Sequence, residues 1–486
     1  MKKFTKFLTL LLAVLMCFCV GACDNSGGES TAVIYKENFP DDLDKSFLIT
    51  DKSQFRYDVT DAGERSLILF EELRKVYYRD GMAFPWRAGY YDDRLSNSFL
   101  WDFGALHSMA NAVLRANPDN ETAKYWLGEI SDDLETYYNR FDTERIADRS
   151  FWNKDLENNM FSEEFIGLAM RIMQIKGTVE ADGKMRYRMP VRIYGSNTSG
   201  TDPYYDDNVW VVMSLFEAGE QLGRPEYIQR AEECMMYVLS GWDDAAGGGL
   251  RWKESHATKN TCSNGPAAMA CMMFYNYYKS LTPENDEQKA LYEDKQKFYL
   301  QFAKYIYEWT KSVLMDTSDG TYGDNIELKG DGSYTVNMGK LTYTTGTMLS
   351  AAIRIYEATL EPEYKADADK TIRGAYQTFV SRDRFYAPGI DLYPDSDGWF
   401  NVYLVQGYLD YARVFGNDAY LRKMRDVMDF AYKNARNYYG LIQNDWSGRD
   451  NSPDAHYNSQ QLRNAAAPIE VTALVDAWFD AHPSEG

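Results

Sequence analysis

The sequence predicts an all-α protein in which helical hairpins close into a ring, an (α/α)6 toroid. Apolar residues recur at helical spacing from about residue 65 to residue 478, between loops rich in Gly, Pro, Asp and Asn. About a dozen helices in pairs follow one another without a Pro-rich linker or charge run between them. The loops differ in length and show no fixed repeat period, which disfavours an open solenoid of tetratricopeptide type.

The helices are expected in an unbroken series, with strands only in between as short pieces. Strand-like alternation is confined to residues 185–193 and 322–336, and the second of these contains the hairpin dipeptide Asp331-Gly332. The expected helices span residues 65–79, 99–116, 121–140, 162–176, 207–222, 225–240, 264–280, 286–314, 343–360, 363–381, 399–415, 417–436 and 459–481.

The N-terminus has the pattern of a bacterial lipoprotein signal peptide. Lysines precede an apolar run over residues 7–20, and Gly21-Ala22 come directly before Cys23. We therefore expect residues 1–22 to be removed, residues 23–60 to form a lipidated Cys23 with a flexible tether, and residues 61–486 to form a single domain. The alternative is an ordinary cleaved signal with an incidental cysteine.

A lipidated Cys23 predicts a location on the bacterial cell envelope, at the outer membrane, the cell surface or the periplasmic side. The apolar run is too short for a membrane span, so the expected membrane contact is through the lipid anchor alone. A monomer is expected, since nothing in the sequence indicates an oligomer.

The remaining cysteines and the histidines predict neither a disulfide scaffold nor a metal site. Three cysteines (Cys234, Cys262 and Cys271) lie in the body of the chain, and an odd, sparse set is typical of buried free thiols. A Cys262–Cys271 pair is the alternative. The four histidines are scattered, and His107 lies within a helical run where a core role is expected. No cofactor is expected.

The net charge and the amino-acid composition indicate which kinds of binding partner are favoured. Removal of residues 1–22, which carry three lysines, takes the formal net charge from −21 to −24 and disfavours nucleic acid and anionic surfaces. Aromatic residues make up 15% of the chain, including 38 Tyr and 11 Trp. Aromatic faces stack on the apolar faces of pyranose rings, which favours a polysaccharide or oligosaccharide substrate, although a helical core also uses aromatic residues.

Two adjacent carboxylates, Asp206 and Asp207, lie at the predicted start of a helix, in the segment Tyr204-Tyr205-Asp206-Asp207-Asn208-Val209-Trp210. One Asp in a first turn is explained by capping and the helix dipole, whereas the second is left over. Retaining glycosidases use two carboxyl groups about 5–5.5 Å apart, one as nucleophile and one as acid/base. Two like charges at such a short distance move the two pKa values apart. One carboxyl group can then be ionised as the nucleophile while the other keeps a proton as the acid.

Several loops that precede helices carry the same kinds of residue. They include Gly247-Gly248-Gly249-Leu250-Arg251-Trp252, Ser263-Asn264-Gly265-Pro266-Ala267-Ala268, Tyr343-Thr344-Thr345-Gly346-Thr347 and Trp399-Phe400-Asn401-Val402-Tyr403. Together with the Asp-Asp segment, these motifs resemble glycoside hydrolase family 76, the α-1,6-mannanases, from about residue 99 to residue 480. The resemblance departs at Thr344-Thr345, where the family more often has Asn-Gln.

The resemblance implies an (α/α)6 barrel and endo-acting hydrolysis of α-1,6-mannosidic bonds in mannan with retention at the anomeric carbon. Carried over by position, Asp206 would be the nucleophile and Asp207 the acid/base. The expected substrate-binding residues are Tyr204, Tyr205, Asp102, Trp252, Asn264, Tyr343 and Trp399. Packing is the alternative role for Trp252, Tyr343 and Trp399, and capping is the alternative for Asn264. Tyr204 and Tyr205 could also exclude water or orient the Asp pair.

Two other functions fit parts of the sequence. A non-catalytic glycan-binding lipoprotein also suits a helical, acidic, aromatic-rich chain, but it has no need for adjacent carboxylates. An (α/α)6 hydrolase acting on another glycan is the second alternative. The letters Tyr-Tyr-Asp-Asp also occur at residues 90–93, where no helical apolar run follows, and we interpret that copy as a loop.

Overall fold

The computed structural model describes residues 52–79, 82–83, 98–146, 161–195, 203–449 and 460–483, all within one compact unit, Asp44–Gly486. Each predicted helix has a counterpart, and the largest difference is at the helix expected over residues 121–140, which ends as an α-helix at Asp133 and continues as a 3-10 helix, Leu134–Tyr137. The α-helices are α2 (Ala62–Tyr77), α3 (Leu100–Ala116), α4 (Glu121–Asp133), α5 (Glu163–Ile172), α6 (Tyr205–Leu222), α7 (Pro225–Ser240), α8 (Thr261–Ser280), α9 (Asp286–Leu314), α10 (Thr342–Thr359), α11 (Pro362–Phe379), α12 (Trp399–Phe415), α13 (Ala419–Asn434) and α15 (Leu462–Ala481).

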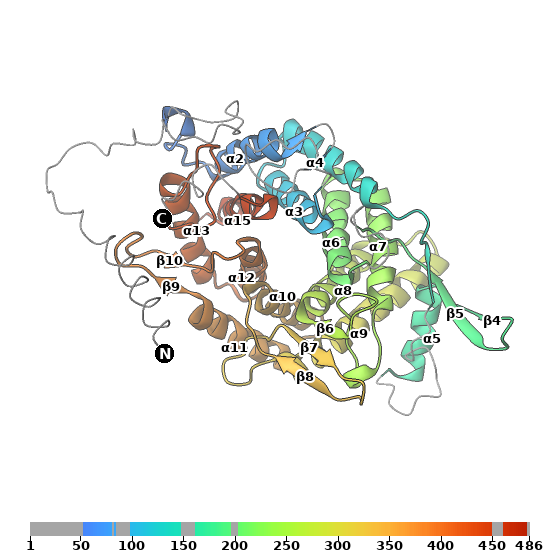
Figure 1. Cartoon of the computed structure of the whole chain (residues 1–486). Helices are drawn as coiled ribbons and strands as arrows, with labels where there is room; N and C mark the ends of the chain where they lie inside the picture. The colour runs from blue at the N-terminus through green and yellow to red at the C-terminus, as the bar shows by residue number, and fades with distance from the viewer. Residues whose placement is uncertain are drawn as a thin grey trace, which may run out of the picture. The chain divides into compact units, whose positions relative to one another are not determined.

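Six of the described helices form a closed inner ring. In order around the ring they are α3, α6, α8, α10, α12 and α15, and α15 returns to pack on α3. A second set lies outside: α4, α7, α9, α11, α13 and α2 each pack against the inner ring, and the alternation of inner and outer helices is visible in Figure 1. This arrangement confirms the predicted all-α ring of helical hairpins.

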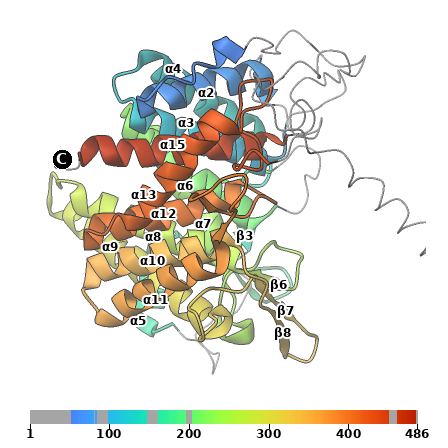
Figure 2. The same ribbon diagram turned by 90° about the vertical axis from the view of Figure 1, so that its left-hand side faces the viewer.

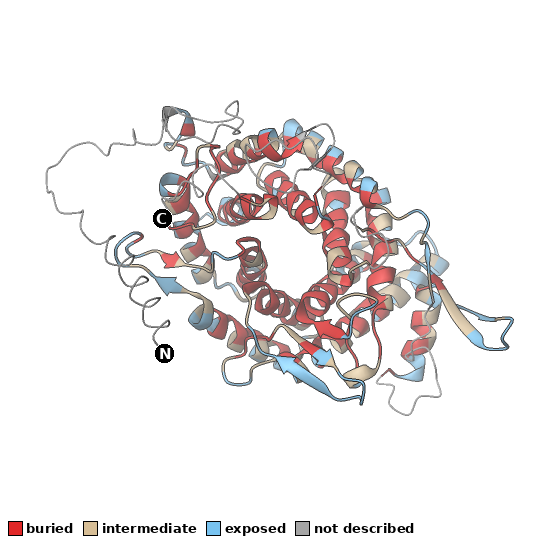
Figure 3. Cartoon of the chain, in the orientation of Figure 1, coloured by how far each residue is buried: buried red, intermediate tan, exposed pale blue. Residues whose placement is uncertain are grey.

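Burial separates the two rings. The inner helices are buried on nearly all sides, whereas the outer helices expose one face, as Figure 3 shows. A helix that is apolar all round belongs in a core, and an amphipathic helix belongs at a surface. Glycine allows the closest inner contacts: a Cβ on Gly346 of α10 would lie 2.4 Å from the backbone oxygen of Tyr403 on α12.

The strands are short and lie in the connections between the helices. One antiparallel sheet has the order β6 (Thr258–Asn260), β7 (Asn325–Leu328), β8 (Tyr334–Asn337), and Figure 2 shows it at the opposite end from the C-terminus of α15. A second has the order β3 (Glu144–Ile146), β5 (Met185–Pro190), β4 (Lys176–Val179). Two-stranded pairs are β1 (Tyr78–Arg79) with β2 (Met82–Ala83) and β9 (Ser381–Arg382) with β10 (Asp391–Leu392). The two predicted strand regions are confirmed as β5 and the β7–β8 hairpin.

The predicted tether extends too far into the chain. Residues 52–55 form a short 3-10 helix, Phe55 and Val59 are buried, and the Phe55 carbonyl accepts a hydrogen bond of 2.6 Å from Arg436 Nη1. These apolar side chains belong to the core, so the folded part starts before residue 61.

Several predictions fall outside the described residues. They are the signal peptide over residues 1–22, the lipidated Cys23 and the second Tyr-Tyr-Asp-Asp segment at residues 90–93. Among the residues that the structure describes, none of the helices is both long and apolar enough to cross a membrane.

The prediction for the thiols and His107 is confirmed. Cys234, Cys262 and Cys271 are free and buried. His107 is buried in α3 and its Nε2 lies 2.8 Å from Ser131 Oγ, so it is a core residue. The described residues contain no cluster that could hold a metal ion.

Candidate active site

The first turns of the inner helices surround a cavity of about 400 Å³. Five of the six inner helices contribute to its lining, because they all begin at this end of the ring. Helix N-termini carry partial positive charge, which favours carboxylates here. The lining residues are Trp101, Asp206, Asp207, Trp210, Trp252, His256, Thr258, Asn260, Cys262, Asp324, Asn325, Leu341, Tyr343, Trp399 and Phe400.

The carboxylate of Asp206 is held by three donors. Its Oδ2 accepts a hydrogen bond of 2.8 Å from Trp252 Nε1 and one of 3.3 Å from Cys262 Sγ. Its Oδ1 accepts the backbone N–H of Asp207 at 2.9 Å. Donors on the charged form stabilise it, so this environment favours an ionised Asp206.

The two carboxyl groups differ in how strongly they hold a proton. Burial raises the pKa of Asp206 to about 6, and the hydrogen bonds from Trp252 and Cys262 oppose that rise. Burial raises the pKa of Asp207 well above its ordinary value, and the negative charges of Asp206 and Asp102 raise it further. Among the described residues, no cation is a cause of either shift. The pair therefore favours one ionised carboxylate, Asp206, beside one protonated carboxyl, Asp207.

Asp102 contributes to this asymmetry from the neighbouring helix α3. Its Oδ1 accepts a hydrogen bond of 3.2 Å from Arg463 Nη1, and Arg463 Nε donates to Asp397 Oδ2 at 2.8 Å. The Arg463 guanidinium also lies over the Trp101 ring, 4.2 Å from its centroid. Asp102 is 3% exposed and does not line the cavity. Its predicted hydrogen bond to a substrate hydroxyl is thus replaced by an ion pair.

A glycine-rich loop brings Trp252 to Asp206. Gly249 has φ +90°, and a Cβ there would lie 2.4 Å from the Trp309 ring, so only glycine fits. Below the loop, the fully buried Lys259 donates to the backbone oxygens of Asp243, Ala245 and Gly248 at 3.0, 2.7 and 2.5 Å. Lys259 Nζ also lies 2.7 Å from Asp243 Oδ1. This lysine fixes the loop that carries Trp252.

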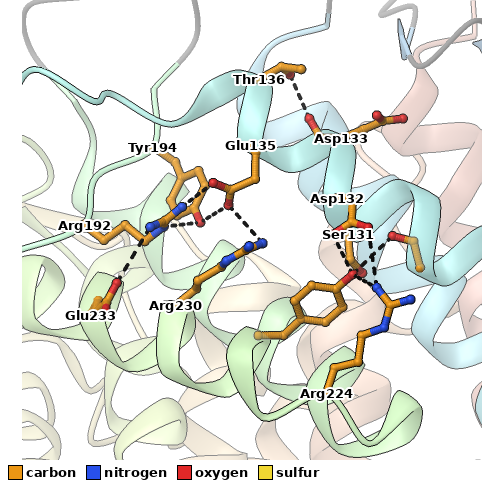
Figure 4. A network of polar contacts seen from close by, with 12 residues as sticks. Ser131, Asp132, Asp133, Glu135, Thr136, Arg192, Tyr194, Arg224, Arg230 and Glu233 are labelled. Atoms are coloured by element: carbon orange, nitrogen blue, oxygen red, sulfur yellow. Dashed lines mark hydrogen bonds and ion pairs between the residues drawn. The ribbon is translucent and has the colours of Figure 1, made fainter.

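The approach to α6 is fixed by Asn208 and a network of charges. Asn208 is fully buried, accepts the Tyr194 N–H at 2.8 Å, and donates to the carbonyls of Tyr194 and Tyr204 at 2.9 and 2.8 Å. Tyr194 Oη in turn donates to Glu135 Oε1 at 2.9 Å. Arg192 forms an ion pair with the same Glu135 side chain, as drawn in Figure 4. The chain before and after the Asp pair is therefore anchored from both sides.

Tyr205 and Asn264 do not reach the cavity. Tyr205 is buried and stacks on Tyr237, with ring centroids 4.8 Å apart. Asn264 accepts the Leu250 N–H at 2.8 Å and donates to the carbonyls of Leu250 and Asn260. The Asn264 amide is thus hydrogen-bonded to the backbone of the glycine-rich loop. Tyr205 and Asn264 therefore stabilise the site and do not contact the cavity.

Tyr204 and Trp252 pack on each other, with ring centroids 5.0 Å apart. Trp252 lines the cavity, whereas Tyr204 does not. The expected substrate contact is therefore restricted to Trp252, and Tyr204 supports its ring.

Tyr343 and Trp399 both line the cavity. The Tyr343 ring packs against Phe400, with centroids 4.4 Å apart, and the Trp399 ring packs against Trp210 at 5.0 Å. The buried Nε1 of Trp399, like that of Trp101, has no hydrogen-bond partner in the described part of the chain. An orphaned indole N–H in a cavity wall is suited to donate to a ligand oxygen.

Thr344 and Thr345, where the sequence differs from the family pattern, lie away from the cavity. Thr344 and Thr345 are fully buried. Thr344 Oγ1 donates to the Leu341 carbonyl at 2.9 Å, and Thr345 Oγ1 accepts the Tyr322 N–H at 3.2 Å. Both hydroxyls bind backbone, so this departure does not change the cavity wall.

Sequence reasoning missed several cavity residues, among them Cys262, Asn260 and Asp324. The expected start of α8 was residue 264, whereas the helix begins at Thr261 directly after β6. Cys262 therefore lies in the first turn beside Asp206 and not in a loop. Asp324 comes from the turn before β7, and only the tertiary pairing of β6 with β7 brings it to the cavity.

Comparison with known proteins gives a family match over part of the chain. Residues 183–391 match the family model described as glycosyl hydrolase family 76. No curated protein matches the chain. The matched range confirms the resemblance seen in the motifs, although the Trp399–Tyr403 motif lies beyond it.

Solved structures share the fold at low identity. A family 76 glycoside hydrolase from a bovine Bacteroides thetaiotaomicron strain is 19% identical, with 87% of this chain and 79% of that chain covered and a TM-score of 0.67. A family 76 mannosidase from Bacteroides thetaiotaomicron is 18% identical, with coverages of 86% and 99% and a TM-score of 0.65. An inactive α-1,6-mannanase variant from a Salegentibacter species, in complex with α-1,6-mannotriose, is 19% identical, with coverages of 85% and 99% and a TM-score of 0.59. In that variant two consecutive aspartates are replaced by asparagine.

Proposed function

Since this chain carries a glycosyl hydrolase family 76 segment over residues 183–391, we propose that it is a retaining, endo-acting hydrolase of α-1,6-mannosidic bonds in mannan. The observation that carries the proposal is the Asp206–Asp207 pair in a cavity wall, with raised pKa values and, among the described residues, no cation as a cause of either shift. Two carboxyl groups with separated pKa values suit a nucleophile and a proton donor, whereas capture of a glycan needs no such adjacent pair. The pair therefore favours catalysis over capture.

In the proposed mechanism, Asp206 attacks the anomeric carbon while Asp207 protonates the departing glycosidic oxygen. The C–O bond to the leaving sugar breaks as the ester bond to Asp206 forms. Asp207, now ionised, removes a proton from water, which attacks the mannosyl-enzyme and restores both groups. The higher pKa of Asp207 matches the role of proton donor, and the three hydrogen bonds on Asp206 match that of an ionised nucleophile.

The substrate class rests on the cavity wall and on the relatives. Trp252, Tyr343 and Trp399 provide aromatic surface, and the indole N–H groups of Trp101 and Trp399 are suited to sugar hydroxyls. The Salegentibacter α-1,6-mannanase, which is inactive after replacement of two consecutive aspartates, supports the choice of linkage. A lipid anchor at Cys23 and a monomeric state belong to the same proposal.

The test is the release of reducing sugar from unbranched α-1,6-mannan by the protein and by its Asp206→Asn and Asp207→Asn variants. We expect oligosaccharide products from the wild type and activity near background from both variants. Proton NMR of the first-formed anomer should show retention. Binding of mannan without turnover would support the glycan-binding alternative, and inactivity without binding would point to another glycan.

The same protonation states predict a bell-shaped dependence of kcat/KM on pH. Asp206 must lose its proton and Asp207 must keep one, so the rate rises as pH passes upward through about 6 and falls as Asp207 ionises. A pH profile with constant activity down to pH 4 would contradict the assignment of Asp206 as the ionised nucleophile.

A further inference from the structure

We propose that the Cys262 thiol positions Asp206 and helps to hold its carboxylate in the ionised form. The inference rests on the proposed function and adds one positioning residue to it. Cys262 lies in the first turn of α8 and Asp206 in the first turn of α6, so the contact joins two neighbouring inner helices.

The contact is a hydrogen bond from a buried thiol. The Cys262 thiol donates to Asp206 Oδ2 at 3.3 Å. Cys262 is 5% exposed and lines the cavity. A thiol is a weak donor, but a hydrogen bond to an ionised acceptor is stronger than one between neutral groups.

The thiol acts together with Trp252 on one oxygen atom. Asp206 Oδ2 accepts from both Trp252 Nε1 and Cys262 Sγ, which fixes the plane of the carboxylate from two elements, the glycine-rich loop and α8. Losing either donor frees the carboxylate to rotate about its Cβ–Cγ bond and weakens the charged form. Both effects reduce the efficiency of a nucleophile that must meet one carbon atom.

Other ionisable groups near Asp206 act in the opposite direction or do not touch it. Asp207 follows it on α6, Asp102 faces the pair from α3, and Asp324 and His256 line the cavity from loops. Three of these four groups are acids, which favour protonation of Asp206. Within the described residues, the thiol and the indole are thus the two side chains recorded as donors to this carboxylate.

The other thiols provide a comparison within the chain. Cys271 lies on the same helix, fully buried, nine residues beyond Cys262 and away from the cavity. Burial raises the pKa of both thiols, so both stay protonated at neutral pH. They differ in that Cys262 has a carboxylate acceptor, and replacing Cys271 is therefore a matched control.

The experiment uses Cys262→Ala and the control Cys271→Ala, with folding checked by thermal unfolding. In the substrate-free proteins, the pH dependence of Asp206 labelling by a water-soluble carbodiimide, followed by peptide mass spectrometry, reports its protonation. We expect the midpoint to rise by about 0.5–1 pH unit in Cys262→Ala and not at all in Cys271→Ala. On α-1,6-mannan, the acid limb of kcat/KM should shift by the same amounts.

A Cys262→Ser variant keeps a donor and should lie between Cys262→Ala and the wild type. A midpoint in Cys262→Ala equal to that of Cys271→Ala would overturn the proposal. If Cys262→Ala fails to fold, Cys262→Val decides, because it removes the donor and leaves no cavity in its place. Labelling needs no substrate, so an inactive wild type would count against the proposed function and leave the role of Cys262 decided by the labelling.

Discussion

The cavities at the two ends of the helical ring differ in how their carboxylates are paired. At the end where the inner helices begin, the cavity of about 400 Å³ is lined by Asp206 and Asp207, and no described cation is a cause of their pKa shifts. At the end where they finish, a larger cavity of about 710 Å³ is lined by ion pairs, including Arg354–Asp410 at 2.8 Å and Arg115–Glu217 at 3.2 Å.

The difference shows that cavity volume alone does not identify an active site. Asp410 is buried, but Arg354 and Arg413 both pair with it. A paired carboxylate has its charge already neutralised, whereas an unpaired one is free to bind a proton or attack carbon. We therefore place the proposed chemistry in the smaller cavity.

The largest predicted effect compares the same substitution at the two ends. Asp207→Asn should lower kcat on α-1,6-mannan by about 10³-fold or more, because the proton donor is lost. Asp410→Asn should leave kcat within about twofold and lower the free energy of unfolding by about 1–3 kcal/mol through loss of its arginine pairs. Reducing-sugar assays and urea unfolding measure both. A large loss of kcat in Asp410→Asn would contradict the proposed difference between the two cavities.

The second prediction concerns Lys259, the buried cation behind the catalytic end. Lys259→Met removes the ion pair with Asp243 and three hydrogen bonds to the glycine-rich loop, which should cost about 3–5 kcal/mol of stability. Trp252 should then lose its bond to Asp206, so kcat/KM should fall by about 10-fold or more in folded protein.

Lys329→Met is the matched control, because Lys329 is 39% exposed and pairs only with Glu327 at 2.8 Å. Such a surface pair contributes under about 1 kcal/mol. Equal losses of stability in the two variants would show that Lys259 has no special role in holding the loop.

A third prediction tests Glu470, a buried carboxyl between the two ends. It lies on α15, is 1% exposed, and accepts a hydrogen bond of 2.5 Å from Ser108. Burial raises its pKa to about 8 from an ordinary value of 4.5. The neutral folded form is therefore fully favourable below about pH 4.5, and this stability is lost as pH rises through about 8.

Glu470→Gln should remove this loss while keeping an acceptor for Ser108. Between pH 5 and pH 8 the variant should gain about 2–4 kcal/mol in unfolding free energy relative to the wild type. Urea unfolding at the two pH values measures the difference. Parallel behaviour of the two proteins would show that Glu470 ionises in the folded state.

The smallest effect is expected at Thr345, in the motif that departs from the family. Thr345→Val leaves the buried Tyr322 N–H without its acceptor, which should cost about 1–2 kcal/mol. The product pattern on α-1,6-mannan should not change, because Thr345 lies away from the cavity. Thermal unfolding and product chromatography test both statements. An altered set of products would show that this motif influences the subsites.

The helices and the Asp pair were predictable from the sequence because their signals are local. Apolar periodicity located the helices, and two charged residues in the first turn of α6 exceed what a cap requires. The errors occurred where contacts are long-range. The predicted tether includes residues up to 60, although Phe55 and Val59 are core residues. The sequence predicts a sugar contact for Asn264, whereas its amide binds the loop at Leu250.

The sequence by itself determined an all-α ring, buried free thiols and the catalytic candidates Asp206 and Asp207. Only the tertiary structure decided what surrounds them: the Trp252 and Cys262 donors on Asp206, the exclusion of Tyr205 and Asn264 from the cavity, and the ion pair of Asp102 with Arg463. The reason is physical. Periodicity and capping act over a few residues, whereas desolvation and hydrogen bonding at the site depend on helices brought together by closure of the ring.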